Sequence, residues 1–292
     1  MSAARSTDIH LGVIGSGVMA EAMIAGLLRE NRVAAGQIVC ADPSGSRRED
    51  MARMGVSTTS DNAVAVREAA VILLSVKPQV AGTVLEGLRG SLASDTLVIS
   101  IVAGVTTAAL RSGLGHQRVV RAMPNTPAQV GAGMTVWFAA EAVDNEGRER
   151  TRAILSALGE ELEVADEHQV SMATAISGSG PAYVFLYMEA LTNAAVHLGL
   201  HRDVARRLVV QTVRGSADLA RQSGRHMAEL RDMVTSPGGT SAAALNRLES
   251  GKLRGIMDDA VRAAFQRTIE LETSLDRQLG GHGGGPGSDP AR

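Results

Sequence analysis

Residues Ile9 to Ala20 read IHLGVIGSGVMA, an apolar run that enters a Gly-Ser-Gly turn and continues as a helical pattern from Val18 to Glu30. In a strand-turn-helix setting, Gly15 permits a tight turn and Gly17 lets a pyrophosphate approach the backbone, while Ala20 lets the helix pack close to the sheet. The helix start offers free amides and a positive dipole end to phosphates. This stretch therefore predicts a dinucleotide-binding turn.

The first half of the chain alternates strand-like and helical patterns, which is typical of an α/β domain with a Rossmann-type doubly wound parallel sheet. A short strand near Val56 to Thr58 fits the series, and two added edge strands are expected at Met134 to Ala139 and Leu162 to Ala165. We expect this dinucleotide-binding domain to span residues 1–165. The main predicted strands are Ile9 to Ile14, Ile38 to Ala41, Val71 to Val76, Leu97 to Val102 and Val119 to Met123.

After Asp166 the strand signal ends and helical patterns take over, which predicts an all-helical second domain over residues 166–279. These helices have no sheet of their own to pack against, so we expect them to bury their apolar faces in a homodimer. The Gly-rich segment 280–292 has too few apolar residues to fold and is predicted to be a disordered tail. The expected helices are Glu167 to Ala175, Pro181 to Leu198, Arg202 to Ser223, Met227 to Val234, Ser241 to Ser250 and Gly255 to Leu279.

Composition restricts the classes of partner. The 292 residues include 29 basic and 31 acidic side chains and only 2% aromatics, a balance that disfavours nucleic acid as a partner. No membrane segment is expected, because the longest uncharged stretch contains Ser-Gly-Ser-Gly-Pro. Cys40, the one cysteine, reads as a buried apolar residue, and no secretion signal is evident. The chain is expected to be cytoplasmic.

The end of the second predicted strand carries groups of both charges. Asp42 is placed to accept a hydrogen bond from a ribose 2′-hydroxyl, as in an enzyme that uses NADH. Ser44, Arg47 and Arg48 are placed to hold a 2′-phosphate, as in an enzyme that uses NADPH. The alternative is structural: Asp42 is a turn residue, and the arginines form a solvated first helical turn. We favour NADPH, with NADH also accepted.

Further candidates follow the other parallel strands, whose carboxyl ends lie at the ligand edge in this architecture. Ser75, Val76, Lys77 and Pro78 close one strand, and Lys77 is either a cofactor contact or a surface residue ahead of a helix. Ala103 and Gly104 follow the next strand. The loop Met123 to Pro127 holds Asn125 between two prolines, where its side chain could bond a ligand or backbone.

Two loops rich in small residues open helices in the second half. The first is Ser177 to Pro181, where a serine before Gly-Pro at a helix start by itself favours a capping role. The loop Thr235 to Ser241 offers backbone amides and three hydroxyls, which suits a carboxylate. No metal-binding motif, nucleophile elbow or Walker A loop is present, so no metal site is expected. Hydride transfer to an activated electrophile fits what remains, because it needs mainly binding and orientation.

Together these motifs resemble those of the pyrroline-5-carboxylate reductases over about Ile9 to Leu275. The most specific parts are AISGSGPAYVF, from Ala175 to Phe185, and DMVTSPGGT, from Asp232 to Thr240. Val76-Lys77-Pro78 and the loops after the next two strands match the family in the same order. Asp42-Pro43 stands where the family often has an Asn-Arg or Ser-Arg pair.

The resemblance implies NAD(P)H-dependent reduction of the C=N bond of 1-pyrroline-5-carboxylate to L-proline, the last step of proline biosynthesis. It implies a cofactor on the first domain and a substrate held by the second domain of a dimer, with five dimers assembling further into a pentamer of dimers. The cofactor residues implied are Gly15, Ser16, Gly17, Val18, Met19, Ala20 and Asn62, with Ser75, Val76, Lys77, Pro78, Ala103 and Gly104 on the nicotinamide side.

The substrate carboxylate is assigned by the resemblance to Ser236, Gly239, Thr240 and Ser241, with Glu167 and Thr174 nearby. Thr174 is the candidate for orienting the ring nitrogen, and the alternative is a hydroxyl bonded back to its own helix. Two rival functions remain. A β-hydroxyacid dehydrogenase is disfavoured because Pro181 to Leu198 contains no lysine, and a binding-only regulator is disfavoured because the Ser-Pro-Gly-Gly-Thr loop is intact.

Overall fold

The computed structural model describes residues 10–280. Ile9 and residues 281–292 of the expected tail lie outside the described residues, whereas Gly280, the first residue of that expected tail, is the last residue of a helix. The described chain divides into two compact units. The first contains the residues up to Gly178 and from Ala264 onward, and the second is Ser179–Ala263. The contact boundaries therefore differ from the expected division at residue 165, because the helices that follow it and the end of the last helix pack with the first unit.

In the described part of the first unit, eight strands form one sheet in the order β3-β2-β1-β4-β5-β6-β7-β8. Strands β1 to β6 pair in parallel, β7 runs antiparallel to β6, and β8 pairs in parallel with β7. The predicted Rossmann-type doubly wound sheet is confirmed and both added strands are present, but only β8 of the two is an edge strand, because β7 lies between β6 and β8. The strands are β1 (Leu11–Ile14), β2 (Ile38–Ala41), β3 (Ser57–Thr59), β4 (Val71–Leu74), β5 (Leu97–Ser100), β6 (Val119–Met123), β7 (Gly133–Ala139) and β8 (Gly159–Glu163).

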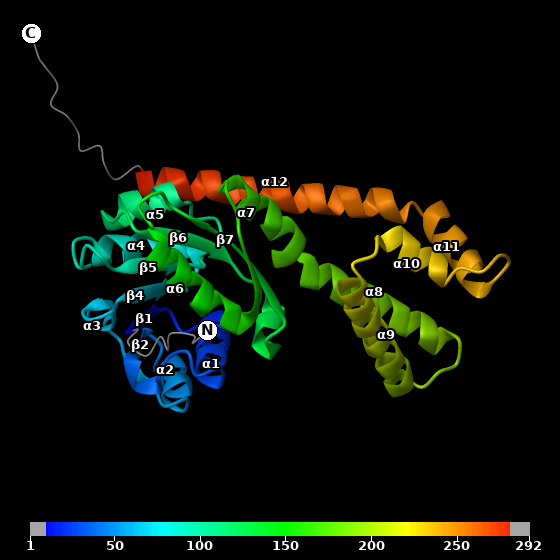
Figure 1. Ribbon diagram of the computed structural model, residues 1–292, viewed down its shortest axis with the longest axis horizontal. Coiled ribbons are helices and arrows are strands. Elements are labelled where there is room, and N and C mark those ends of the chain that lie inside the picture. The colour runs from blue at the N-terminus through cyan, green and yellow to red at the C-terminus, as the bar shows by residue number, and fades with distance from the viewer. Residues whose placement is uncertain (1–9, 281–292) are drawn as a thin grey trace, which may run out of the picture. The chain divides into compact units, whose positions relative to one another are not determined.

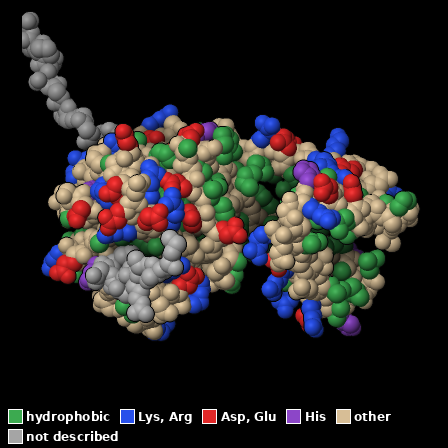
Figure 2. All heavy atoms as spheres, in the orientation of Figure 1, with side chains coloured by type: hydrophobic (Ala, Val, Ile, Leu, Met, Phe, Trp, Pro, Cys, Tyr) green, Lys and Arg blue, Asp and Glu red, His purple; other side chains and the backbone are tan. Residues whose placement is uncertain are grey.

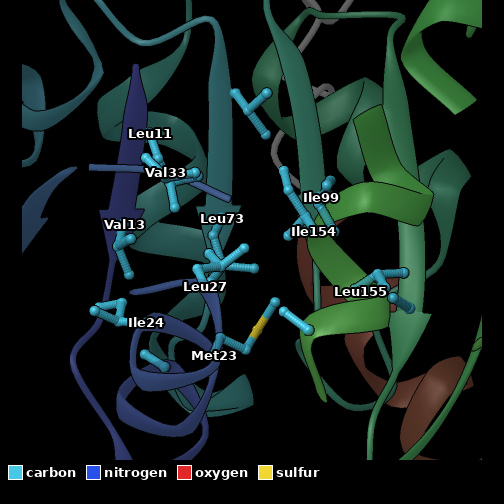
Figure 3. Packing of buried hydrophobic residues seen from close by; sticks show 14 of the residues in the cluster. Leu11, Val13, Met23, Ile24, Leu27, Val33, Leu73, Ile99, Ile154 and Leu155 are labelled. Carbon is cyan, nitrogen blue, oxygen red and sulfur yellow. The ribbon is translucent and has the colours of Figure 1, made fainter. Parts of the chain in front are cut away.

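The side chains of β1 show why the sheet is covered on both faces. Successive strand residues point to opposite faces, so Leu11 and Val13 enter one apolar cluster and Ile14 enters the other. Figure 3 shows the first cluster, in which Leu11 and Val13 lie with Met23 and Leu27. All four strand residues of β1 are buried, which is typical of a central parallel strand.

Helices supply the outer layers on both faces (Figure 1). Side chains of α1 (Val18–Arg29), α2 (Gly45–Ala52) and α6 (Asn145–Leu155) belong to the first cluster. Side chains of α3 (Asn62–Val66), α4 (Pro78–Leu88) and α5 (Thr107–Leu114) belong to the second. After β8, α7 (His168–Ala173) is followed by a π-helical turn, Thr174–Gly178. Short 3-10 turns span Ala35–Gln37, Thr126–Val130 and Ser156–Leu158.

The second unit contains helices whose bounds lie within two residues of those expected. They are α8 (Gly180–His197), α9 (Arg202–Ser223), α10 (Met227–Met233), α11 (Thr240–Ser250) and the beginning of α12 (Leu253–Gly280). The last helix continues into the first unit, where Leu275 joins the second apolar cluster. Figure 1 shows α12 as one uninterrupted helix.

The second unit leaves much of its apolar surface uncovered. Within Gly180–His197, Thr192 is the one buried residue, although the segment is rich in apolar side chains. Phe185, Leu186 and Tyr187 are each more than half exposed. Hydrophobic side chains are visible on the surface of this unit in Figure 2. An apolar surface of this extent on a helical unit marks an interaction site.

Candidate active site

The carboxyl ends of three central strands meet at the glycine turn. The Gly15 amide donates to the Ala41 carbonyl at the end of β2, across 2.8 Å, and the Ser75 amide donates to Ile14 at the end of β1, also across 2.8 Å. Hydrogen bonds therefore connect the end of β1 and the turn after it to the last residue of β2 and to the first residue after β4. These bonds bring together the expected cofactor residues Gly15, Ser16, Asp42 and Ser75.

The glycines of the turn have different physical roles. Gly15 has a φ of +89°, and a Cβ added there would lie 2.7 Å from the Ser75 carbonyl oxygen, so only glycine fits. Gly17 is the N-cap of α1 in extended conformation, and a Cβ there would meet nothing within 4 Å. Its backbone therefore borders open space beside the first amides of α1, which helix geometry leaves without intrahelical partners. Val18, Met19 and Ala20 form the first turn of this helix.

Asp42 supports the turn through its carboxylate. One oxygen accepts a 2.8 Å hydrogen bond from the Ser16 amide, and the other accepts a 2.8 Å bond from the Ser44 amide. Each oxygen keeps one lone pair for a further donor such as a ribose hydroxyl. The structural role of Asp42 and its expected role as a ribose acceptor are thus compatible. Ser16 Oγ is buried without a hydrogen-bond partner, which is uncommon for a polar atom.

Arg47 lies in the first turn of α2, where its side chain is 28% exposed and is hydrogen-bonded on three sides. Its Nε donates to the Ser16 carbonyl at 2.7 Å, and its two terminal nitrogens donate to Asp50 and Glu21, each at 2.7 Å. The bond with Glu21 raises the pKa of the guanidinium above its ordinary value. Ser44 is the N-cap of α2, and its hydroxyl lies 3.0 Å from that of Ser46.

The remaining expected cofactor residues lie along the same edge of the sheet. Lys77 is exposed and is the N-cap of α4, and Pro78 occupies the first turn of that helix. Ser75 and Val76, half-buried, precede them directly after β4. Ala103 and Gly104 follow β5, and a Cβ on Gly104 would lie 3.1 Å from Leu275. Asn62 opens α3, which follows β3.

Thr174 lies at the start of the π-helical turn that follows α7. Its hydroxyl donates to the Val170 carbonyl across 2.9 Å, which is the second of the two alternatives drawn from the sequence. The Ser177 hydroxyl makes the same bond to Ala173 across 3.0 Å. Since the proton of Thr174 is used within the helix, the free lone pairs of its oxygen can only accept a hydrogen bond. Short π-helical turns are frequent at functional sites.

Glu167 belongs to a polar network inside the first unit. Its carboxylate accepts hydrogen bonds from the amide and the hydroxyl of Thr107, at 2.7 and 2.6 Å, and from Arg121 at 3.3 Å. Arg121 is buried on β6 and also donates to Glu272 of α12. Ser171 donates to the same oxygen of Glu272 at 2.6 Å. The network joins β6, α5, α7 and α12.

Sequence reasoning missed Arg121, although a signal was present. Arg121 interrupts the apolar run Val119 to Met123, which forms a buried strand. A charge in such a strand requires a partner, because isolated buried charges are very costly. For Asn125, the sequence left open whether its side chain bonds a ligand or backbone, and the structure shows backbone partners. Its amide donates to the Ser177 carbonyl at 3.0 Å, and its oxygen accepts from the Met134 amide at 2.9 Å.

The second unit carries the expected carboxylate-binding loop between α10 and α11. Gly238 has a φ of +69°, and Gly239 is the N-cap of α11 without a side-chain cap. A Cβ on Gly239 would lie 2.4 Å from Ser236 Oγ, so the hydroxyl rests directly against the helix start. Thr240 and Ser241 form the first turn. The loop presents hydroxyls and unbonded amides at one exposed helix N-terminus.

Two further properties concern the described residues as a whole. No helix in the range 10–280 is both long and apolar enough to cross a bilayer. Within the same range, no three or more His, Cys, Asp or Glu side chains are grouped so that they could hold a metal ion.

Comparison with known proteins identifies the family. Residues 167–271 match a model described as pyrroline-5-carboxylate reductase dimerisation, and residues 10–104 match one described as NADP oxidoreductase, coenzyme F420-dependent. A pyrroline-5-carboxylate reductase from Synechocystis is 44% identical over 265 residues, which cover 90% of this chain and 98% of the relative.

Solved structures agree with the sequence comparison. A pyrroline-5-carboxylate reductase from Coxiella burnetii superposes with a TM-score of 0.84 at 40% identity, covering 90% of this chain and 98% of the other. A pyrroline carboxylate reductase from Plasmodium falciparum with NADP bound superposes with a TM-score of 0.82 at 32% identity, covering 91% and 98%. The chain is an oxidoreductase and belongs to the pyrroline-5-carboxylate reductase family.

Proposed function

We propose that this chain reduces 1-pyrroline-5-carboxylate to L-proline with NADPH as the preferred cofactor and NADH as an accepted one. The observation that carries the proposal is the turn from Gly15 to Ala20 at the meeting point of three parallel strands, in a chain of this family. The Plasmodium falciparum structure, 32% identical, holds NADP, which supports a nicotinamide cofactor.

The residues of the first unit fit a dinucleotide. The open space beside Gly17 and the first amides of α1 suit a pyrophosphate, and Asp42 has lone pairs for a ribose hydroxyl. Asn62 is proposed to lie on the adenosine side. The segments Ser75 to Pro78 and Ala103-Gly104 are proposed to lie on the nicotinamide side. When bound, the nicotinamide supplies the hydride for C5 of the ring.

Thr174 is proposed to orient the substrate ring. A protonated imine is the better electrophile, and its N–H is a donor that needs an acceptor. Thr174 Oγ1 can only accept, because its proton is held by the Val170 carbonyl. It therefore binds the ring in its protonated form and holds C5 in orientation, without acting as an acid. Glu167, whose carboxylate is bonded to Thr107 and Arg121, positions α7 near the substrate.

The carboxylate of the substrate is proposed to bind at the start of α11. The first amides and the positive dipole end of the helix favour an anion there, and Ser236, Thr240 and Ser241 add hydroxyl donors. Gly239 keeps the backbone open at the N-cap. A carboxylate fixed in this way sets the position of the ring through its attached carbon.

We also propose a homodimer built on the helical unit, with further assembly into a pentamer of dimers. The support for a dimer is the uncovered apolar surface of α8 and the match of residues 167–271 to a dimerisation model. Burying residues such as Phe185 and Leu186 against a second copy removes from water the apolar surface that this unit leaves uncovered.

The experiment that tests the function is the loss of nicotinamide absorbance with purified protein. NADPH and NADH are each supplied with and without 1-pyrroline-5-carboxylate, and proline is measured as the product. Substrate-dependent oxidation with equal formation of proline is expected. Oxidation that does not depend on the substrate, or none with either cofactor, would refute the proposal.

A further inference from the structure

Acidic side chains hold the arginine that follows the second strand. A guanidinium has five N–H donors, and Arg47 uses three of them for the Ser16 carbonyl, Asp50 and Glu21. The bond to Ser16 fixes the guanidinium directly beside the glycine turn. Two donors remain for a ligand that approaches the turn.

The charges around Arg47 do not favour an additional anion. The Arg47 guanidinium carries one positive charge and forms ion pairs with the carboxylates of Glu21 and Asp50, each at 2.7 Å. The Asp42 carboxylate is bonded to the same turn through the Ser16 amide. A phosphate group brings about two further negative charges at neutral pH. It must therefore compete for Arg47 with carboxylates that are already bound.

We propose that Glu21 is a specificity-determining residue for the cofactor, whose carboxylate competes with the 2′-phosphate of NADPH for Arg47. This competition weakens NADPH binding but not NADH binding. It therefore reduces the preference of the chain for NADPH over NADH. The inference rests on the cofactor site proposed above. It explains why an arginine and an aspartate can both follow β2 in a chain that accepts both cofactors.

Glu21, more than Asp50, suits this role by its position. It lies in the first turn of α1, four residues after Gly17, and bridges to an arginine of α2. Asp50 is divided between two cations, since it also accepts a 2.8 Å bond from Arg53. The Glu21 side chain is 44% exposed, so a ligand can displace it and salt can screen it.

The test is the substitution Glu21→Gln, with binding of two probes measured by calorimetry. Adenosine 2′,5′-bisphosphate and adenosine 5′-monophosphate differ only in the 2′-phosphate. We expect the bisphosphate to bind about 1.5- to 5-fold more tightly to the variant, which corresponds to the roughly 0.2 to 1 kcal/mol that an exposed ion pair contributes. Binding of the monophosphate is expected to be unchanged. The difference between variant and wild type should shrink as salt rises, because salt screens exposed charges.

The matched control is Glu30→Gln, which changes the net charge equally at the other end of α1. Glu30 contacts Arg29 and Arg32 but not Arg47. This variant should bind both probes like the wild type. In steady-state assays, the ratio of kcat/KM for NADPH to that for NADH should rise in Glu21→Gln by the same factor as bisphosphate affinity.

The inference alone is overturned if Glu21→Gln binds the bisphosphate like the wild type, or if both probes gain affinity equally. It is also overturned if Glu30→Gln reproduces the gain, since the effect is then one of net charge. If the wild type binds neither probe nor NADPH, the proposed cofactor site itself is refuted. The binding data thus separate the two failures.

Discussion

Arg121 and Glu272 stand 151 positions apart in the chain, and the Arg121 guanidinium donates to the Glu272 carboxylate across 2.5 Å. Arg121 is 4% exposed and Glu272 is 9% exposed. Their bond attaches the second half of α12 to β6. Ser171 adds a third element, because it donates to the same carboxylate oxygen.

The substitution Glu272→Gln is expected to lower the free energy of unfolding by about 3 kcal/mol, because it leaves the Arg121 charge buried without its closest partner. The measurement is urea denaturation at equal protein concentration, since any oligomer links stability to concentration. Glu270→Gln is the matched control on the same helix. Glu270 forms an exposed pair with Arg267, so its loss should cost less than about 1 kcal/mol. Equal losses in the two variants would contradict the importance of burial.

The glycines of the turn should separate stability from cofactor binding. Gly15→Ala forces a side chain into positive φ and against the Ser75 carbonyl, so we expect it to cost about 2 kcal/mol of stability. Gly17→Ala meets no neighbour and has φ −70°, so its melting temperature should match the wild type. Its methyl group instead fills the space proposed for the pyrophosphate. The Kd for NADPH should rise about tenfold, which corresponds to roughly 1.4 kcal/mol.

Thermal unfolding and cofactor titration of both glycine variants check this prediction. A Gly17→Ala protein that binds NADPH like the wild type would show that the pyrophosphate does not approach the turn there. A Gly15→Ala protein with unchanged stability would show that the turn relaxes at little cost.

The sequence was sufficient to predict the elements whose signals are local. The strand before Gly15 and the long helical patterns each follow from periodicity, and most helix ends were placed within two residues. Of the two added strands, Met134 to Ala139 was placed within one residue of β7, whereas the strand that became β8 was harder to place because it lacks a continuous apolar pattern. The expected strand Leu162 to Ala165 instead spans Gly159–Glu163, in which no residue is buried. Partial exposure weakens the alternation on which the prediction depends.

The interactions of the site residues could not be predicted from the sequence. The distance from Arg47 to Glu21 depends on how α1 and α2 pack on one face of the sheet, and the two residues are 26 positions apart. The bonds of Glu167 to Thr107 and Arg121 depend on the fold in the same way. Motifs identify which residues lie near the strand ends, whereas their hydrogen-bond partners follow from tertiary packing.

Thr174→Val is expected to lower kcat/KM for 1-pyrroline-5-carboxylate by about 10- to 100-fold, because a hydrogen bond to a charged group contributes roughly 1.5 to 3 kcal/mol. Thr174→Ser keeps the acceptor and should retain most of the activity. Thr268→Val is the matched control, since the Thr268 hydroxyl is also bonded to the carbonyl four residues before it. Full activity in Thr174→Val, with unchanged melting temperature, would remove Thr174 from the proposed mechanism.

Cys40 should make stability fall at alkaline pH. Its side chain is fully buried on β2, and burial raises the pKa of the thiol from 9.0 to about 12. Above pH 9 the unfolded chain loses this proton while the folded chain keeps it. Ionisation therefore stabilises the unfolded state, and the free energy of unfolding falls as pH rises. At pH 10 this difference is about 1.4 kcal/mol.

The substitution Cys40→Ala removes this contribution. The variant has a small cavity and should be less stable than the wild type at pH 7, but its stability should fall less between pH 8 and pH 10. Urea denaturation of both proteins at each pH measures the difference. In parallel, a thiol reagent at pH 8 should leave the native wild type unlabelled and label it fully in denaturant, because the folded chain buries the thiol and its raised pKa keeps it protonated. Rapid labelling of the native protein would show that β2 opens to solvent and that burial does not control this thiol.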